Sequence, residues 1–120
     1  MENAPDYSHI RLKDAHGITV VEVLEREIRH PGPAADFGFE VYGLVEREGH
    51  KRLLLDFTKN EYLCSTAFAV LVNLKKKVDE VGGQLKICGM SEEVLAGAHI
   101  IRLPELIEIY ADERTALASF

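Results

Sequence analysis

Leu53-Leu54-Leu55-Asp56-Phe57 opens the stretch of sequence that decides the fold, which runs on to Met90. The apolar run closes with an acid, and a polar turn, Thr58-Lys59-Asn60-Glu61, follows it. Leu63-Cys64-Ser65-Thr66-Ala67 then forms a corner rich in hydroxyl groups, ahead of a long amphipathic segment. Two glycines and a second apolar run, Leu85 to Cys88, complete the stretch. Because short apolar runs bounded by polar turns are typical of buried strands, we expect a strand-helix-strand unit.

The amphipathic segment, Phe68 to Val81, has the spacing of a helix. One face of this helix carries the apolar residues Ala67, Leu71, Leu74, Val78 and Val81. Gly82 follows at the position where a helix C-terminus favours a residue with positive φ. Ser65 and Thr66 are therefore expected at the N-terminus of this helix.

The unit resembles the STAS domain, the fold of bacterial anti-sigma-factor antagonists. In that family a buried strand ends in an L-D-[LF] segment, and a D-S-[ST]-G motif opens the helix that follows. Leu55-Asp56-Phe57 matches the strand end, and Cys64-Ser65-Thr66-Ala67 stands in the place of the motif. Cys64 replaces the acid of the motif and Ala67 replaces its glycine. The resemblance covers roughly residues 18 to 120, because Leu106 to Tyr110 and Asp112 to Phe120 resemble the family's last strand and closing helix.

Composition limits the classes of function. The chain has 120 residues, the length of one domain, so we expect a single STAS-like domain over residues 1–120. Hydrophobic residues make up 47% of the chain and charges of both signs are mixed, as in globular proteins. The net charge of −6 argues against nucleic acid or an anionic membrane surface as a partner, because both attract concentrated basic residues.

Targeting signals and cysteine usage bear on the compartment. The N-terminus lacks the features of a signal peptide, and no apolar stretch is long enough to span a bilayer. Cys64 and Cys88 lie in apolar surroundings and are too few for a disulfide framework. We therefore expect a cytoplasmic protein with reduced thiols.

Strands and helices alternate in the rest of the chain. Tyr7 to Lys13 is a candidate edge strand, and Ile18 to Leu24 is expected to be a buried strand, with Glu25 to Arg29 as its polar extension. Pro31-Gly32-Pro33 is expected to interrupt regular structure. A helix should follow from Ala35, although each of its two interior glycines costs about 1 kcal/mol relative to alanine.

The last two helices carry clear start signals. Ser91 and Asp112 are expected to cap them, because serine and aspartate oxygens accept hydrogen bonds from the first N–H groups of a helix. Together these elements predict an α/β fold with a mixed, mostly parallel central sheet of four to five strands and about four helices.

Ser65 is the main candidate for chemistry. The first N–H groups of a helix are unpaired and favour an anion, so a phosphate on Ser65 is electrostatically compatible with this position. Residue types alone leave open a simpler interpretation, in which Ser65 or Thr66 only caps the helix. The resemblance implies that Ser65 is a phosphoacceptor, with Thr66 as the second choice.

The resemblance also implies a partner. It predicts an anti-sigma-factor antagonist-like regulatory protein, not an enzyme, that binds a cytosolic anti-sigma factor with serine-kinase activity and frees its sigma factor. The kinase itself would use ATP and Mg²⁺, so neither a cofactor nor a metal is expected on this chain. A homodimer is left open. The predicted contact surface consists of Thr58, Asn60, Cys64, Ser65, Thr66, Ala67, Asn73 and Met90.

Three alternatives remain. Because Cys64 and Ala67 depart from the motif, the chain could instead be a degenerate STAS domain, acting as an unphosphorylated scaffold or a small-ligand-binding module. A thiol at a helix N-terminus can be reactive, but no Cys-x-x-Cys motif or nearby base supports an enzyme built on Cys64. Asp56 at a strand end resembles the phosphorylated aspartate of a response-regulator receiver. Glu25 and Glu27 imitate the acidic pair of a receiver only poorly, and the last strand lacks the lysine.

Overall fold

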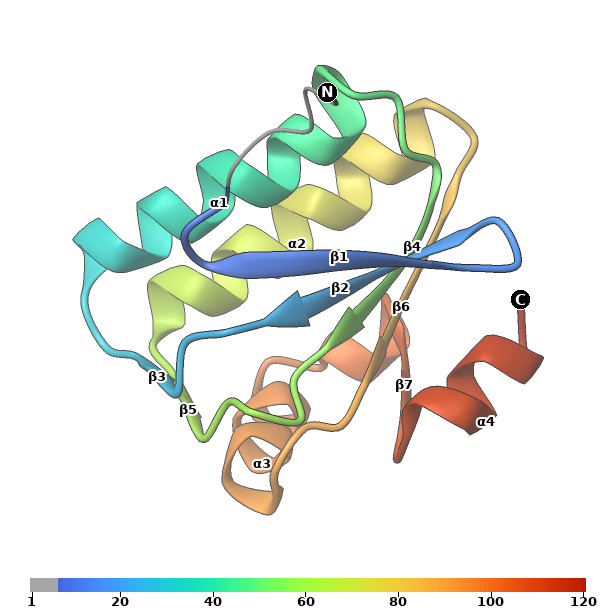
Figure 1. The fold of residues 1–120 in the computed structure, drawn as a ribbon. Helices are drawn as coiled ribbons and strands as arrows, with labels where there is room; N and C mark the ends of the chain where they lie inside the picture. The colour runs from blue at the N-terminus through green and yellow to red at the C-terminus, as the bar shows by residue number, and fades with distance from the viewer. Residues whose placement is uncertain (1–6) are drawn as a thin grey trace.

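Five strands form the main sheet in the order β1-β2-β4-β6-β7, in a computed structural model that describes residues 7–120 (Figure 1). β1 and β2 are antiparallel, and the remaining neighbours are all parallel. The strands are β1 (Ile10–Ala15), β2 (Ile18–Val23), β4 (Arg52–Asp56), β6 (Gln84–Cys88) and β7 (Glu108–Tyr110). The predicted α/β fold with a mixed, mostly parallel sheet is confirmed.

A tight turn joins β1 to β2. His16 and Gly17 occupy it with φ values of 55° and 85°, as in the two-residue turns whose twist suits a hairpin. The register runs from Ile10 opposite Val23 to Ala15 opposite Ile18. The predicted edge strand is therefore present, but it is shifted three residues towards the turn at its start and two at its end.

The segment after β2 does not extend that strand as predicted. Glu27–Ile28 (β3) leaves the main sheet and pairs in parallel with Tyr62–Leu63 (β5), which the sequence analysis did not anticipate. Ile28 is fully buried and Leu63 nearly so, while Glu27 is exposed. Burial of these two apolar side chains favours the small separate sheet over a polar extension of β2.

The first helix begins earlier than predicted. α1 spans Pro31–Glu46, so the segment Pro31-Gly32-Pro33 is its first turn and not an interruption. The N–H groups of the first turn of a helix have no hydrogen-bond partner within the helix. A proline there, which lacks an N–H, therefore removes no hydrogen bond. Gly38 also has a packing reason, since a Cβ at this position would lie 3.1 Å from a methyl group of Val70 on α2 (Ser65–Glu80).

The two faces of the sheet are covered unequally. α1 and α2 lie side by side over the face that carries Val21, Leu55 and Ile87, where the larger hydrophobic core forms (Figure 1). The small helix α4 (Glu113–Ala118) covers part of the opposite face. The smaller core there consists of Ile18, Val20, Leu54, Cys88 and Ala116.

Most predicted helix ends are confirmed. The Ser91 hydroxyl accepts the N–H of Val94 at 3.2 Å at the start of α3 (Glu92–Ile100), and Asp112 accepts the N–H of Thr115 at 2.8 Å before α4. Gly82 has a φ of 71° after the end of α2. Val81 is the exception, because it lies beyond the helix and is 39% exposed instead of facing the core.

A short 3-10 turn, Leu103–Glu105, connects α3 to β7. Across residues 7–120, none of the helices combines the length and the apolar character that crossing a membrane requires.

Candidate functional site

The corner between β5 and α2 positions Ser65. Cys64 is the N-cap residue, with extended backbone angles and no side-chain hydrogen bond to the helix. Its carbonyl accepts the N–H of Phe68 at 3.1 Å, and its own N–H donates to the carbonyl of Ile28 at 2.8 Å. Ser65 is consequently the first helical residue and is exposed, and Thr66 follows it half-buried. The interpretation of Ser65 or Thr66 as the cap of this helix is wrong.

An apolar groove begins beside Ser65 and runs between α2 and α3. Its volume is about 400 Å³. Ile100 is 81% exposed and Ile101 is 45% exposed, which is unusual for isoleucine. The groove is lined by Leu63, Ser65, Phe68, Ala69, Val72, Gly97, Ile100 and Ile101. The Ser65 hydroxyl therefore lies at the rim of an apolar surface.

This groove was not predicted from the sequence. Val72 and Phe68 were assigned only to a helix, and Ile100 and Ile101 were not singled out. A signal existed for Ile100, because Val94 and Ala98 share one face of this helix at a spacing of four residues and Ile100 lies on the opposite side.

Besides Ser65 and Thr66, four of the predicted contact residues keep accessible surface. Thr58 is exposed in the loop after β4, and Met90 is half-buried after β6. Cys64 is half-buried at the corner itself. Asn73 is exposed on α2 but does not line the groove, because it lies in a separate surface hollow with Tyr42 and Lys77.

Asn60 and Ala67 differ from the prediction of direct partner contact. Asn60 is only 1% exposed, and its amide donates to the carbonyls of Glu25 at 3.0 Å and Tyr62 at 3.2 Å. It joins the loop after β2 to the loop after β4. Ala67 is fully buried in the core. Both residues support the corner from beneath and offer a partner almost no surface.

The two thiols differ in environment. Cys88 is fully buried on β6, opposite Asp56 of β4. Burial, followed by the negative charge of Asp56, raises the pKa of the Cys88 thiol to about 12. At neutral pH Cys88 is therefore a protonated core side chain. Cys64 alone has accessible surface.

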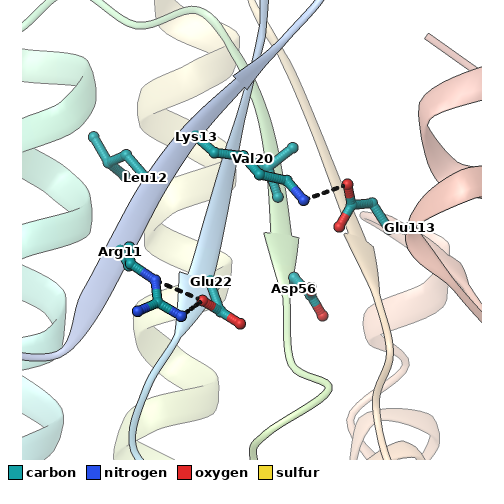
Figure 2. Close-up of a pocket in the computed structure, with 7 residues that line it drawn as sticks. All are labelled: Arg11, Leu12, Lys13, Val20, Glu22, Asp56 and Glu113. Atoms are coloured by element: carbon teal, nitrogen blue, oxygen red, sulfur yellow. Dashed lines mark hydrogen bonds and ion pairs between the residues drawn. The ribbon is translucent and has the colours of Figure 1, made fainter.

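A second, polar cavity lies on the opposite face of the sheet, between β1, β2, β4 and α4 (Figure 2). Its volume is about 170 Å³. Arg11 donates to Glu22 at 2.6 Å and holds the pKa of that carboxyl below its usual range. Lys13 forms an ion pair with Glu113 at 3.0 Å. Asp56 lines the cavity at the end of β4, and the four other charged side chains pair with one another (Figure 2).

The acidic arrangement of a receiver does not form. Asp56 accepts hydrogen bonds from the N–H of Thr58 at 2.9 Å and from its hydroxyl at 2.5 Å. Glu25 pairs with His9 at 2.9 Å, and Glu27 pairs with Arg29 at 2.8 Å. In the part of the chain that the structure describes, no three His, Cys, Asp or Glu side chains are grouped to hold a metal ion.

Solved structures share this fold. A candidate anti-sigma factor antagonist from Thermotoga maritima superposes with a TM-score of 0.80 over 92% of each chain, at 20% identity. An anti-sigma factor antagonist from Mycobacterium paratuberculosis gives 0.78 at 22% identity, over 98% of this chain and 97% of that one. The Bacillus cell fate determinant SpoIIAA, in its phosphorylated form, gives 0.68 at 12% identity, over 92% and 97%.

No curated protein sequence matches the chain at a significant level. The family model of the STAS domain matches residues 14–116, which is most of the sequence. That span includes β2, β4, β6 and β7 of the main sheet, the end of β1, the Ser65 corner and the apolar groove. The chain therefore belongs to the STAS domain family.

Proposed function

We propose that this chain is a cytoplasmic anti-sigma-factor antagonist-like protein that binds an anti-sigma factor with serine-kinase activity. In this proposal, phosphorylation of Ser65 by the kinase ends the binding. The observation that carries the proposal is the position of Ser65: exposed, not used as a cap, and at the rim of an apolar groove. The solved structures described as anti-sigma factor antagonists, and that of SpoIIAA in its phosphorylated form, support it.

The groove is suited to a protein partner. Exposed isoleucine side chains gain free energy when a partner removes them from water, at about 25 cal/mol per Å² of apolar surface. Ile100 and Ile101 supply such surface next to Ser65. Unmodified Ser65 is small and uncharged, so it leaves this contact undisturbed.

Phosphorylation would weaken binding of the partner without changing the fold of this chain. A phosphate adds nearly two negative charges at pH 7. The N-terminus of a 16-residue helix tolerates those charges, because its free N–H groups face them. At the rim of an apolar interface the same charges must lose water or meet like charge, which can cost several kcal/mol. The result is a change of partner without a change of shape.

The two departures from the family motif are compatible with this switch. Ala67 replaces the glycine, but its methyl group is fully buried in the core and does not alter the surface. Cys64 replaces the acid and leaves the corner without a carboxylate in the first turn of α2. We propose that the kinase recognises Ser65 through the groove and does not require the acid.

The alternative is an unphosphorylated STAS scaffold or small-ligand-binding module. The polar cavity beneath α4 is the observation that favours a ligand. It is less persuasive than the groove, because Arg11, Lys13, Glu22 and Glu113 already pair with one another. A kinase that binds the chain but never labels it would favour the scaffold.

The test uses the cognate kinase with ATP, followed by intact-mass analysis and peptide mapping. We expect one phosphate, at Ser65, and none on the Ser65→Ala variant. Ser91→Ala is the matched control, since Ser91 also stands at a helix start but is used as a cap. Equal labelling of the Ser65→Ala variant and the parent would overturn the assignment.

The groove is tested by calorimetric binding to the same kinase. Ile100→Asp should abolish measurable binding, because it places a charge in the apolar surface. Leu106→Asp is the control, since Leu106 is 49% exposed but does not line the groove. Equal losses for both variants would mean that the groove is not the interface.

A further inference from the structure

The ladder between β3 and β5 brings Arg29 next to the Ser65 corner. Glu27 pairs with Tyr62, and Ile28 pairs with Leu63. The ladder continues, since the N–H of Cys64 donates to the carbonyl of Ile28 at 2.8 Å. In this parallel register Arg29 comes opposite Cys64, one residue before Ser65. Neighbouring strands lie about 4.8 Å apart, within reach of an extended arginine side chain.

Arg29 is held loosely at present. Its guanidinium donates to Glu27 at 2.8 Å and 3.2 Å and lies 4.5 Å from the centre of the Tyr62 ring. Both partners of the ion pair are well exposed, at 53% for Arg29 and 40% for Glu27. Exposed pairs of this kind contribute little, because water and salt screen them.

The guanidinium also feels a second carboxylate. The hydrogen bond to Glu27 raises the pKa of Arg29, and the charge of Glu93 at the start of α3 adds to the same effect. Its hydrogen bonds to Glu27 and its contact with the Tyr62 ring place the guanidinium on the exposed side of the β3-β5 ladder. The Ser65 corner lies beside β3 through the ladder and beside α3 across the groove.

We propose that, when Ser65 is phosphorylated, the Arg29 guanidinium leaves Glu27 and forms an ion pair with the phosphate on Ser65. This inference rests on the proposed phosphorylation of Ser65. A phosphate dianion carries more charge than a carboxylate and offers two oxygens to the planar fork of a guanidinium. It therefore replaces Glu27 as the preferred partner. Because Cys64 carries no charge, no acid at that position repels the incoming phosphate.

Arg29 thus determines where the phosphate lies in the phosphorylated protein. The phosphate is held against β3 and β5 at the corner, and Glu27 loses its cation. The partner meets an anchored dianion at the rim of the groove and an unpaired carboxylate nearby. Arg29 is a positioning residue in this scheme and takes no part in phosphoryl transfer.

The test needs no kinase. Phosphoserine is incorporated at position 65 during synthesis, and the pH titration of its phosphorus resonance is followed by NMR. A neighbouring cation favours the dianion and lowers the second pKa of the phosphate. In the Arg29→Gln variant we therefore expect the titration midpoint to rise by about half a pH unit, the size typical of exposed charge pairs.

Arg26→Gln is the matched control. Arg26 forms a similar exposed ion pair, with Glu61 at 3.0 Å, at the far end of the same ladder. The phosphate of the Arg26→Gln variant should titrate with the same midpoint as in the parent. The midpoint of Arg29→Lys should lie between those of the parent and Arg29→Gln, because lysine keeps the positive charge but lacks the two-pronged guanidinium. Equal midpoints in the parent and Arg29→Gln, or an equal rise in Arg26→Gln, would overturn the proposal.

This experiment is independent of the proposed function. If the midpoint rises as expected while no kinase labels Ser65, the pairing with Arg29 stands and the switch fails. If a kinase labels Ser65 but Arg29→Gln leaves the midpoint unchanged, the switch stands and the role of Arg29 is refuted.

Discussion

Helices α2 and α3 begin in different ways, although both follow the end of a strand on the same side of the fold. α3 starts with Ser91, whose hydroxyl accepts the N–H of Val94, and Glu92 and Glu93 occupy its first turn. α2 starts with Cys64, which makes no side-chain cap, and its first turn contains no acid. The start of α3 has both a side-chain cap and acids in its first turn, and the start of α2 has neither.

The difference teaches that the start of α2 is not optimised for stability. A serine, aspartate or asparagine cap contributes about 1 kcal/mol, and an acid in the first turn adds a few tenths more. Local rules are often broken at functional sites, where a surface or a reactive group is kept instead. Substitutions at the start of α2 should therefore change binding and phosphorylation, and substitutions at the start of α3 should change stability.

The largest effect is expected for Ser65→Asp. An acid at the first position of a helix is tolerated or mildly stabilising, so the melting temperature should stay the same or rise. The partner's affinity should fall by about a hundredfold, because the charge lies at the rim of the groove and can cost several kcal/mol. Calorimetric binding and thermal melting on the same samples separate the two effects. A large fall in melting temperature would show that the start of α2 is mainly structural.

Cys64→Asp should increase the rate of Ser65 phosphorylation about tenfold or more. An added charge-assisted hydrogen bond contributes about 1.5–3 kcal/mol, if the kinase can use the acid that the family motif carries. Cys64→Ser is the control, because it caps the helix without adding charge. Phosphorylation kinetics of these two variants, the parent, and Cys64→Asp with Ala67→Gly measure the effect. Rates that remain at zero in all four would favour the scaffold alternative.

Ser91→Ala should destabilise the protein by about 1 kcal/mol, because it removes the cap of α3. Partner affinity should remain within about twofold of the parent, corresponding to less than about 0.5 kcal/mol. Urea unfolding gives the stability, and the binding assay described above gives the affinity. An unchanged stability would mean that the capping rule does not distinguish the two helices.

Ser65→Ala should have the smallest effect on stability. Because Ser65 is exposed and does not cap α2, its hydroxyl can be removed at a cost of less than about 0.5 kcal/mol. The same urea experiment checks this value beside Ser91→Ala. A loss as large as that of Ser91→Ala would remove the contrast between the two helix starts.

The features that the sequence predicted correctly depend on local signals. Ser91, Asp112 and Gly82 act through neighbours within one helical turn, so their roles follow from residue type and position. The buried strands Arg52–Asp56 and Gln84–Cys88 followed from their apolar runs. The position of Ser65 at the start of α2 also followed from the pattern around it.

The features that the sequence did not predict depend on distant contacts. The pairing of β3 with β5 joins residues about 35 positions apart and is fixed by the burial of Ile28 and Leu63. Asn60 was expected at the partner-contact surface, as the family resemblance implied. Its burial depends on carbonyl groups from another loop. The start of α1 at Pro31 was a different error, since a rule against proline inside helices was applied to a first turn.

The turn at His16-Gly17 has a consequence for the order of folding. β1 and β2 are separated by only these two residues, and hairpins of this kind close in about 1–10 μs. Every parallel pair in the main sheet must first bring together strands that are separated by a crossover, and longer loops lose more entropy on closing. The hairpin can therefore order β2 first. β4 then pairs with β2 once α1, which lies between them in the sequence, has formed.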